Sequence, residues 1–405
     1  MKKTIAIWAL ILVHLNIGCV EDKDTQTLPP PPPSTTITKS GQITQDETWD
    51  SSKTILLSGR VVVTNGATLT IKPGTLIKAE AGQEANATTL IIARGAKIMA
   101  EGTARDPIIF TSIADNIQPG EMVSPNLNST FSGLWGGILI LGKAPISAQG
   151  GVISTQIEGI PPSDTSGLYG GNYSLDNSGV LKYVSIRHGG ALIGAGNEIN
   201  GLTLGGVGSG TIIENIEVVA NFDDGIEWFG GSVNCTNLIV WHQGDDAFDI
   251  DQSYSGTINN IVYFANDASD HALEIDGPEG TYEAAFTLTN GTFIGDSTYS
   301  GEYADFRDGA RGDLTNLCFK NFSDNSDVEL DDLTTSDNYK NGILNFNYPW
   351  EFQTTQTFSQ IFVDKSGGNA FTDSSFMYIT KTNSIGANTL QFVGWTLADR
   401  LGMLN

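Results

Sequence analysis

The sequence has little positive charge. Lys and Arg together number 21 against 46 Asp and Glu, which gives a formal net charge of −25 at pH 7. A surface this negative repels phosphate and carboxylate polymers, so we expect no nucleic-acid partner. Charged residues as a whole are also scarce, at 17% of the chain, whereas glycine contributes 47 residues. Because long helices need Ala, Leu, Glu and Lys, this composition favours short strands joined by tight turns.

Cysteine is rare as well, and one of the three cysteines follows an N-terminal leader. Residues 1–18 combine Lys2 and Lys3 with an apolar run that is too short to cross a bilayer as part of a folded protein. This pattern predicts a secretory signal peptide. The segment from Leu15 to Cys19 resembles a bacterial lipobox, which implies that Cys19 is lipidated and becomes the mature N-terminus.

Residues 19–42 read as a tether. The acidic run at residues 20–24 resembles the surface-export signal of Bacteroidetes lipoproteins, which implies a lipid-anchored protein on the outer membrane, facing outward. Five prolines, at residues 29–33, follow as a stiff polyproline spacer. We therefore expect residues 43–405 to form a single domain that the tether holds clear of the membrane.

A six-residue phrase organises this domain. It occurs at residues 223–228, 245–250 and 270–275, in steps of 22 and 25 residues. Each copy has two polar turn residues, a small residue and then an apolar–acidic–apolar alternation. Alternation with a period of two indicates a strand, and its return every 20 to 30 residues indicates a solenoid with one such strand in every coil.

A second column of strands carries asparagine at one place. Apolar residues flank that place two positions before it and three positions after it, and they predict an inward apolar stack. Stacked one strand spacing apart, the side-chain amides can bond to one another up the solenoid. Register places Cys235 inward and Cys318 on the opposite face several coils later, so we expect no disulfide. The ladder residues are Tyr183, Asn215, Asn237, Asn260, Asn290 and Asn316.

With these features the chain resembles all-β proteins that form a right-handed parallel β-helix of the pectin-lyase type, with an asparagine ladder. We expect a short helix near Thr396 to cap the last coil. Residues 135–138, 197–208 and 227–231 are similar to those of uncharacterised Bacteroidetes surface lipoproteins. That likeness implies the fold and the outer-membrane location, and it supplies no activity.

A further resemblance is to polygalacturonase-type glycoside hydrolases, which place their site residues on successive coils. Residues 222–225, 245–246, 270–272 and 306–308 occupy the corresponding places, although Gly309 stands where those enzymes have Lys. An inverting enzyme needs an acid and a base with carboxyls about 6.5–9.5 Å apart. The implied catalytic set is Asp246 as acid, Asp224 and Asp245 as base, and His271 and Arg307 as sugar contacts.

The acids between the inward residues form a predicted metal site. Glu227, Asp249 and Glu274 alternate with inward side chains and are therefore expected to face outward, with Asp251 and Asp276 behind them. Stacked carboxylates repel one another unless a cation intervenes, and calcium suits such oxygen ligands. The structural alternative is that the turn aspartates cap their own backbone and that solvated acids suit a secreted surface.

Four residues are candidates for ligand binding: Asp223, Trp241, His242 and Phe264. Trp241 and Phe264 fall at outward places and could stack on a sugar ring, or they could pack beneath a loop. His188 and His242 share one place on coils separated by one, too far apart for a common zinc ion. We expect a binding protein for a glycan, a divalent cation or a partner protein, with an inverting glycoside hydrolase or a transporter accessory subunit as alternatives.

Overall fold

The computed structural model describes residues 35–83, 86–161, 163–192, 199–299, 301–372, 378–379 and 385–404. The predicted signal peptide, Cys19 and most of the predicted tether lie outside these residues, as do residues 197 and 198 of the lipoprotein-like motif. Strand β1 begins at Thr35, so the folded body includes residues that the sequence assigned to the tether. Within the described part of the chain, no helix is both long enough and apolar enough to span a membrane.

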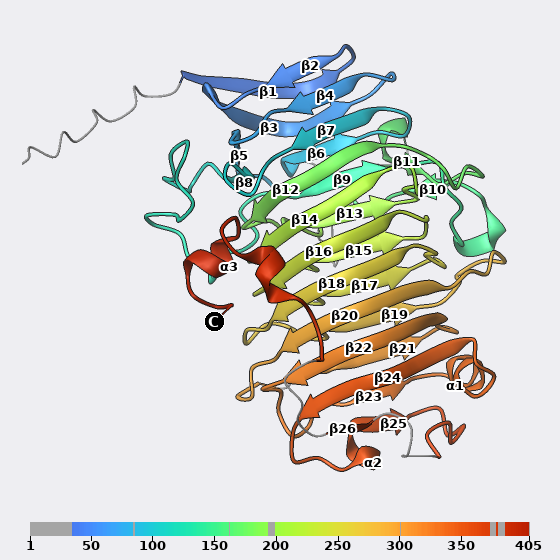
Figure 1. The fold of residues 1–405 in the computed structure, drawn as a ribbon. Helices are drawn as coiled ribbons and strands as arrows, with labels where there is room; N and C mark the ends of the chain where they lie inside the picture. Colours follow the sequence, from blue (N-terminus) through green and yellow to red (C-terminus); the bar gives the residue numbers. More distant parts are fainter. Residues whose placement is uncertain are drawn as a thin grey trace, which may run out of the picture. The chain divides into compact units, whose positions relative to one another are not determined.

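Parallel strands stack into coils over the whole body (Figure 1). Apart from the antiparallel pair β10–β11, every strand pair in the described residues is parallel. With crossover connections of the usual hand, this is a right-handed parallel β-helix, as the sequence predicted. The strands are β1 (Thr35–Ile43), β2 (Glu47–Trp49), β3 (Lys53–Val63), β4 (Thr68–Ile71), β5 (Leu76–Ala79), β6 (Thr89–Ile92), β7 (Lys97–Glu101), β8 (Ile108–Ser112), β9 (Ile138–Leu141), β10 (Thr155–Gln156), β11 (Leu168–Tyr169), β12 (Gly179–Arg187), β13 (Leu202–Gly205), β14 (Ile212–Val219), β15 (Ile226–Phe229), β16 (Asn234–Trp241), β17 (Phe248–Asp251), β18 (Thr257–Phe264), β19 (Leu273–Asp276), β20 (Phe286–Ile294), β21 (Ala304–Arg307), β22 (Gly312–Lys320), β23 (Val328–Leu330), β24 (Leu344–Gln353), β25 (Phe362–Asp364) and β26 (Tyr378–Ile379).

Each regular coil contributes one short strand and one long strand. The short strands β9, β13, β15, β17, β19, β21, β23 and β25 pair in register and form one face, which we call the short-strand face. The long strands bend in the middle: β12 pairs with β7 before its bend and with β8 after it. A coil therefore has three straight runs, whereas the sequence indicated two.

The predicted asparagine ladder lies at this bend. The five ladder asparagines all have φ between 57° and 64°, in the left-handed region that Asn tolerates better than most residues. One residue type thus satisfies both the backbone bend and the ladder. Hydrogen bonds between side-chain amides join neighbouring coils: Asn237 donates to Asn215 (2.9 Å), Asn260 to Asn237 (2.6 Å) and Asn316 to Asn290 (2.6 Å). Asn290 donates to Asn259 (2.7 Å) instead of Asn260.

The core is a continuous stack of apolar side chains inside the coils. Ladder-flanking residues such as Ile213 and Val218 are buried, as are Trp228 and Ile250 of the short strands. Burial of this many apolar side chains is the main stabilising contribution to such a fold. Cys235 and Cys318 are both buried and form no disulfide, as predicted.

A C-terminal segment runs along the side of the helix instead of capping its end. It comprises residues 385–404, with the 3-10 helix η4 (Thr389–Phe392) and helix α3 (Leu397–Arg400), and Thr396 caps α3 as expected. In Figure 1, α3 lies beside β14 and β16. Its first turn is held by Glu217, whose carboxylate accepts the N–H groups of Leu397 and Ala398, both at 2.9 Å.

The last coils are closed by another part of the chain. Helices α1 (Leu333–Lys340) and α2 (Phe358–Ile361) flank them, and aromatic rings from residues 339–371 pack together there. Phe346, for example, lies 4.6 Å from Trp350 and 5.1 Å from Tyr339 between ring centroids. The prediction that the helix near Thr396 covers the last coil is therefore wrong in its position, because this aromatic cluster already fills that place.

Candidate functional site

The first residues of the repeated phrase connect one coil to the next. Oδ1 of Asp224 accepts the backbone N–H of Asp246 at 2.9 Å, and Oδ1 of Asp246 accepts the backbone N–H of His271 at 2.7 Å. The structural alternative, that the turn aspartates cap their own backbone, would have used these carboxylates within their own coil. The bonds to the following coil explain why the acidic phrase repeats, since each copy fixes the turn of its neighbour.

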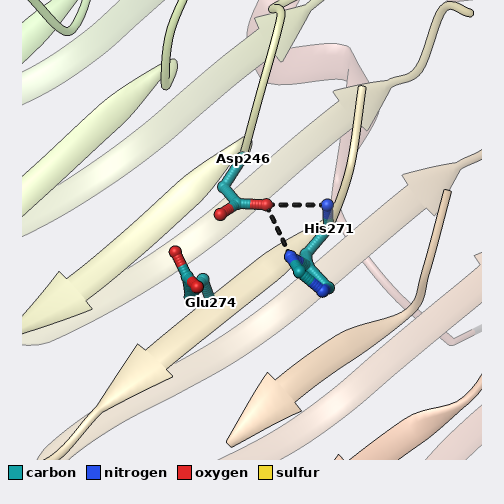
Figure 2. A group of neighbouring side chains, drawn as sticks. All are labelled: Asp246, His271 and Glu274. Carbon is teal, nitrogen blue, oxygen red and sulfur yellow. Dashed lines mark hydrogen bonds and ion pairs between the residues drawn. The ribbon is translucent and has the colours of Figure 1, made fainter. Parts of the chain in front are cut away.

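Asp246, His271 and Glu274 form a compact buried group (Figure 2). Nδ1 of His271 lies 2.8 Å from Oδ1 of Asp246. Burial alone would raise the pKa of Asp246, but the hydrogen bonds from His271 and Glu274 outweigh it and lower that pKa. Burial and the bond to Asp246 raise the pKa of Glu274 to about 10, and the bond to Asp246 raises the pKa of His271 to about 10 against the effect of burial. The group thus holds an ionised aspartate beside a protonated histidine, while Arg307, which contacts Glu274, favours the charged form of that carboxyl.

The acids of the short-strand face form a longer column than the sequence indicated. Consecutive coils place one carboxylate each at equivalent register positions, and we call this set the acidic column: Glu227, Asp249, Glu274, Asp305 and Glu329. Thr203 precedes it and Val363 follows it. Asp305 and Glu329 were not predicted to belong to this column, although residues 304–306 and 328–330 repeat the apolar–acidic–apolar alternation.

The acidic column is buried, which corrects the expectation of a solvated acidic face. Its members point away from the core, yet each is at most 8% exposed. At the upper end, the loop that contains Tyr169 folds back over the short-strand face. Tyr169 packs 6.0 Å from Phe229 between ring centroids and donates to Oε1 of Gln252 at 3.0 Å. Ile146, Ile157 and Ile160 lie in the same apolar cluster.

The lower part of the column has its own cations. Arg307 contacts the carboxylates of Glu274, Asp276 (2.6 Å) and Asp305 (3.7 Å). Lys365 pairs with Glu329. Arg307 and Asp276 are thus parts of one ion-pair network in which basic side chains offset part of the negative charge of the lower column.

The upper part of the column lacks such partners. We call Asp224, Glu227 and Asp249 the upper acidic cluster, because one oxygen from each lies within 4.8 Å of the others. Burial raises the pKa of all three, and the charge of Asp251 raises those of Glu227 and Asp249 further. Among the described residues, no Lys or Arg forms an ion pair with these three carboxylates.

An open groove lies beside the column, at the turns that lead into the short strands. It encloses about 880 Å³, and we call it the turn groove. Loop residues Ser129, Thr130 and Ser132 also line it. The turns of four successive coils contribute Phe222 and Asp223, His242 and Asp245, Asp267, and Asp296 and Tyr299. Two of the predicted ligand-binding residues, Asp223 and His242, therefore lie together in one cavity.

The other two predicted ligand-binding residues lie elsewhere. Trp241 is 2% exposed and Phe264 is 8% exposed, and both pack under the C-terminal segment with Phe392 and Trp395. Both side chains point away from the core, as register predicted. They are nevertheless buried, because the C-terminal segment covers this side of the β-helix. Of the two alternatives given by the sequence, packing beneath another segment is the one observed.

The histidines hold the loop that forms one wall of the groove. Nδ1 of His188 lies 2.6 Å from the carbonyl of Phe131, and Nδ1 of His242 lies 2.6 Å from Oγ of Ser129. Burial lowers the pKa of both rings, so both are neutral near pH 7. The loop at residues 114–132 is thereby fixed against the turns.

Two members of the catalytic set implied by the polygalacturonase likeness are engaged in other contacts. Asp224 and Asp245, the two expected bases, have carboxylate oxygens within 4.8 Å of each other, and Asp246, the expected acid, has the same relation to Glu274. Asp246 is held ionised by His271 and so lacks the proton that a general acid transfers. Arg307 is engaged by three carboxylates, which leaves it poorly placed to hold a sugar.

Comparisons with known proteins address the family. No curated protein and no solved structure matched this chain. A family model described as a pectate-lyase-like β-helix domain matches residues 41–398, which include the acidic column, the turn groove and the C-terminal segment as far as α3. The chain therefore belongs to the family of pectate-lyase-like β-helix domains.

Proposed function

We propose that this protein binds a neutral oligosaccharide in the turn groove. The observation that carries the proposal is the lining of the groove: exposed aromatic rings stand on its first and last coils, with hydrogen-bond acceptors between them. Phe222 is 52% exposed and Tyr299 is 46% exposed. Large apolar groups left open to solvent at the edge of a cavity are typical of a ligand site.

The spacing of the rings suits an extended ligand. Phe222 and Tyr299 belong to turns that are three coils apart, and strand stacking makes that distance about 14 Å. A single sugar ring cannot reach both aromatic side chains, whereas a short oligosaccharide can. Each ring offers a flat apolar face to one sugar unit, and aromatic side chains bury a large area at a small entropy cost.

The polar residues between the rings favour a neutral sugar. Asp245 and Asp267 are exposed and their side-chain carboxylates accept no hydrogen bond from the described residues, so these oxygens are available to sugar hydroxyls. Burial and the charge of Asp246 raise the pKa of Asp245 to about 6, which leaves it mainly ionised at pH 7. Several carboxylates in one groove repel an anionic polymer such as polygalacturonate. The family description refers to pectate lyases, which are named for a polysaccharide, and this supports a carbohydrate ligand.

The same proposal includes the location. Cys19 and the acidic run after it support a lipid-anchored protein on the outer membrane, and the proline-rich tether would hold the groove away from the lipid surface. A surface-anchored β-helix can then collect oligosaccharides from the medium without cleaving them.

Calorimetric titration of the full chain in detergent tests the binding proposal. The probes are neutral gluco-, xylo- and manno-oligosaccharides, with oligogalacturonate as the anionic comparison. We expect at least one neutral series to bind, and Phe222→Ala and Tyr299→Ala each to weaken it about tenfold. Tyr173→Ala is the matched control, because Tyr173 is 57% exposed and does not line the groove.

Three results would contradict the proposal. One is the absence of binding to every neutral series. Another is an equal loss of affinity in Tyr173→Ala, which would place the ligand elsewhere. The third is binding of oligolysine in preference to any sugar, which would identify the groove as a site for cationic peptides.

A further inference from the structure

We propose that the upper acidic cluster holds one divalent cation, with calcium as the preferred ion, inside the folded body and separate from the turn groove. The proposal concerns Asp224, Glu227 and Asp249. Their exposed fractions are 7%, 5% and 7%, and one oxygen of each lies within 4.8 Å of the others. Buried like charges at this separation destabilise a fold strongly unless a cation or protons neutralise them.

The rest of the acidic column provides an internal comparison. Glu274 and Asp305 share Arg307, and Glu329 has Lys365. Each of these three members of the column thus contacts a basic side chain. Only Glu227 and Asp249 lack one among the described residues, and Asp224 of the adjoining turn lies against them. The upper acidic cluster is therefore the part of the column that has no basic partner among the described residues.

Two buried oxygens at this place have no hydrogen-bond partner. Oδ1 of Asp249 is one, and Oδ1 of Asn200 is the other. Asn200 is 1% exposed, and its Nδ2 donates to Glu227 and, at 3.4 Å, to Oγ1 of Thr203. Buried polar atoms almost always have a partner, so an unsatisfied carboxylate oxygen beside two further carboxylates indicates a ligand that binds oxygen.

The donor types select the ion. The three atoms gathered here are carboxylate oxygens, and no His or Cys belongs to the cluster. Such hard oxygen ligands suit calcium, which accepts six to eight of them in flexible geometry, and they do not suit zinc. Magnesium requires a stricter octahedral arrangement and keeps its water, so a cluster under a folded loop favours calcium.

Asp276 and Glu274, two of the metal ligands predicted from the sequence, are not part of this site. Arg307 already occupies the space between their carboxylates and places a positive charge there. Asp251 lies close enough to raise the pKa of both Glu227 and Asp249 and adds to the negative charge around the cluster.

The test measures calcium binding by the full chain after dialysis against a chelator. Calorimetry with CaCl₂ and with MgCl₂, together with luminescence of Tb³⁺ bound in place of calcium, reports affinity and stoichiometry. We expect one calcium ion per chain, weaker binding of magnesium, and a calcium-dependent rise in melting temperature. Asp249→Asn keeps the side-chain shape and is expected to weaken calcium binding at least 100-fold.

Glu329→Gln is the matched control, because Glu329 lies in the same column and has Lys365 as its partner. Calcium affinity equal to that of the wild type is expected for this variant. The proposal is overturned if the wild type binds no calcium at millimolar concentration, or if both variants lose affinity equally. A further result also overturns the proposal: in chelator Asp249→Asn melts at a higher temperature than the wild type, and calcium raises the melting temperature of both proteins equally. The carboxylates would then be neutralised by protons.

Discussion

The backbone of Asn388 and the side-chain amide of Asn260 form a two-point contact. The N–H of Asn388 donates to Oδ1 of Asn260 at 2.6 Å, and its carbonyl accepts from Nδ2 at 3.3 Å. Gly386 makes the same pair of bonds with Asn316, at 3.0 and 3.2 Å. Ladder asparagines therefore bind an extended segment of the chain across the coils in addition to bonding with one another.

We predict that Glu217→Gln detaches the C-terminal segment. Glu217 is fully buried and accepts N–H groups from Leu397 and Ala398, and it lies 4.0 Å from the guanidinium of Arg187, also fully buried. Glutamine preserves the shape but removes the nearer of the two acidic neighbours of Arg187, Glu217 and Asp115, so we expect a loss of about 3 kcal/mol in the free energy of unfolding. Urea unfolding followed by tryptophan fluorescence measures it.

The control for this prediction is Glu214→Gln, on the same strand. Glu214 pairs at 2.7 Å with Lys182 and is 40% exposed in its side chain. An exposed pair contributes little, so the change is expected to stay within about 1 kcal/mol. Equal losses in the two variants would show that Glu217 does not hold the segment.

We predict that Arg307→Gln makes the lower column sensitive to calcium. The substitution removes the charge that Glu274, Asp276 and Asp305 share. Because Arg307 is 39% exposed in its side chain, solvent moderates the effect, and we expect a loss of about 1–3 kcal/mol in calcium-free buffer. Calcium is expected to restore part of it, seen as a larger rise in melting temperature than in the wild type. A loss that calcium leaves unchanged would contradict this account.

We predict that His188 makes stability depend on pH below neutrality. Burial lowers the pKa of His188 in the folded chain, whereas an unfolded histidine titrates near 6.5. Below about pH 6.5 the unfolded chain binds a proton that the folded chain does not, so stability falls as pH falls, by up to about 1.4 kcal/mol per pH unit. Urea unfolding between pH 5 and 8 measures this slope.

His188→Asn tests the assignment of that slope. Asparagine does not titrate and tolerates the φ of 63° at this position. The variant is expected to show a shallower fall in stability below pH 6.5, even if it is less stable at pH 8. Identical slopes in variant and wild type would rule out His188 as the titrating group.

We predict that Cys19→Ala releases the protein from the membrane. Without the thiol no lipid can be attached at residue 19, and the described part of the chain contains no helix that could span a bilayer. Fractionation of cells and labelling with a palmitate analogue measure the change. Replacement of Cys235, which is fully buried in the core, is expected to leave the labelling unchanged.

Periodicity was sufficient to predict the coil architecture because inward and outward residues alternate within each strand. It placed Glu227, Asp249 and Glu274 on one column and the asparagines on another, as the register confirms. It did not show that the long strands bend at the asparagines, since a positive φ leaves no periodic signal beyond the choice of residue. Nor did it show what covers each face.

Coverage depends on segments that are remote in sequence. Trp241 is buried by residues beyond 390, and the top of the short-strand face is covered by the loop that contains Tyr169. No local pattern connects Glu217 with Leu397, which lie 180 positions apart. The turn groove was equally hidden, because loop residues such as Ser129 form one wall of it.

The position of the C-terminal segment sets an order of assembly. Ribosomes deliver residues 385–404 after every strand that they cover has been made. Until then, the apolar surface that includes Val219, Ile239 and Val262 has no cover. A chain that has not yet made or has lost residues 385–404 thus exposes an apolar lateral surface that these residues otherwise cover.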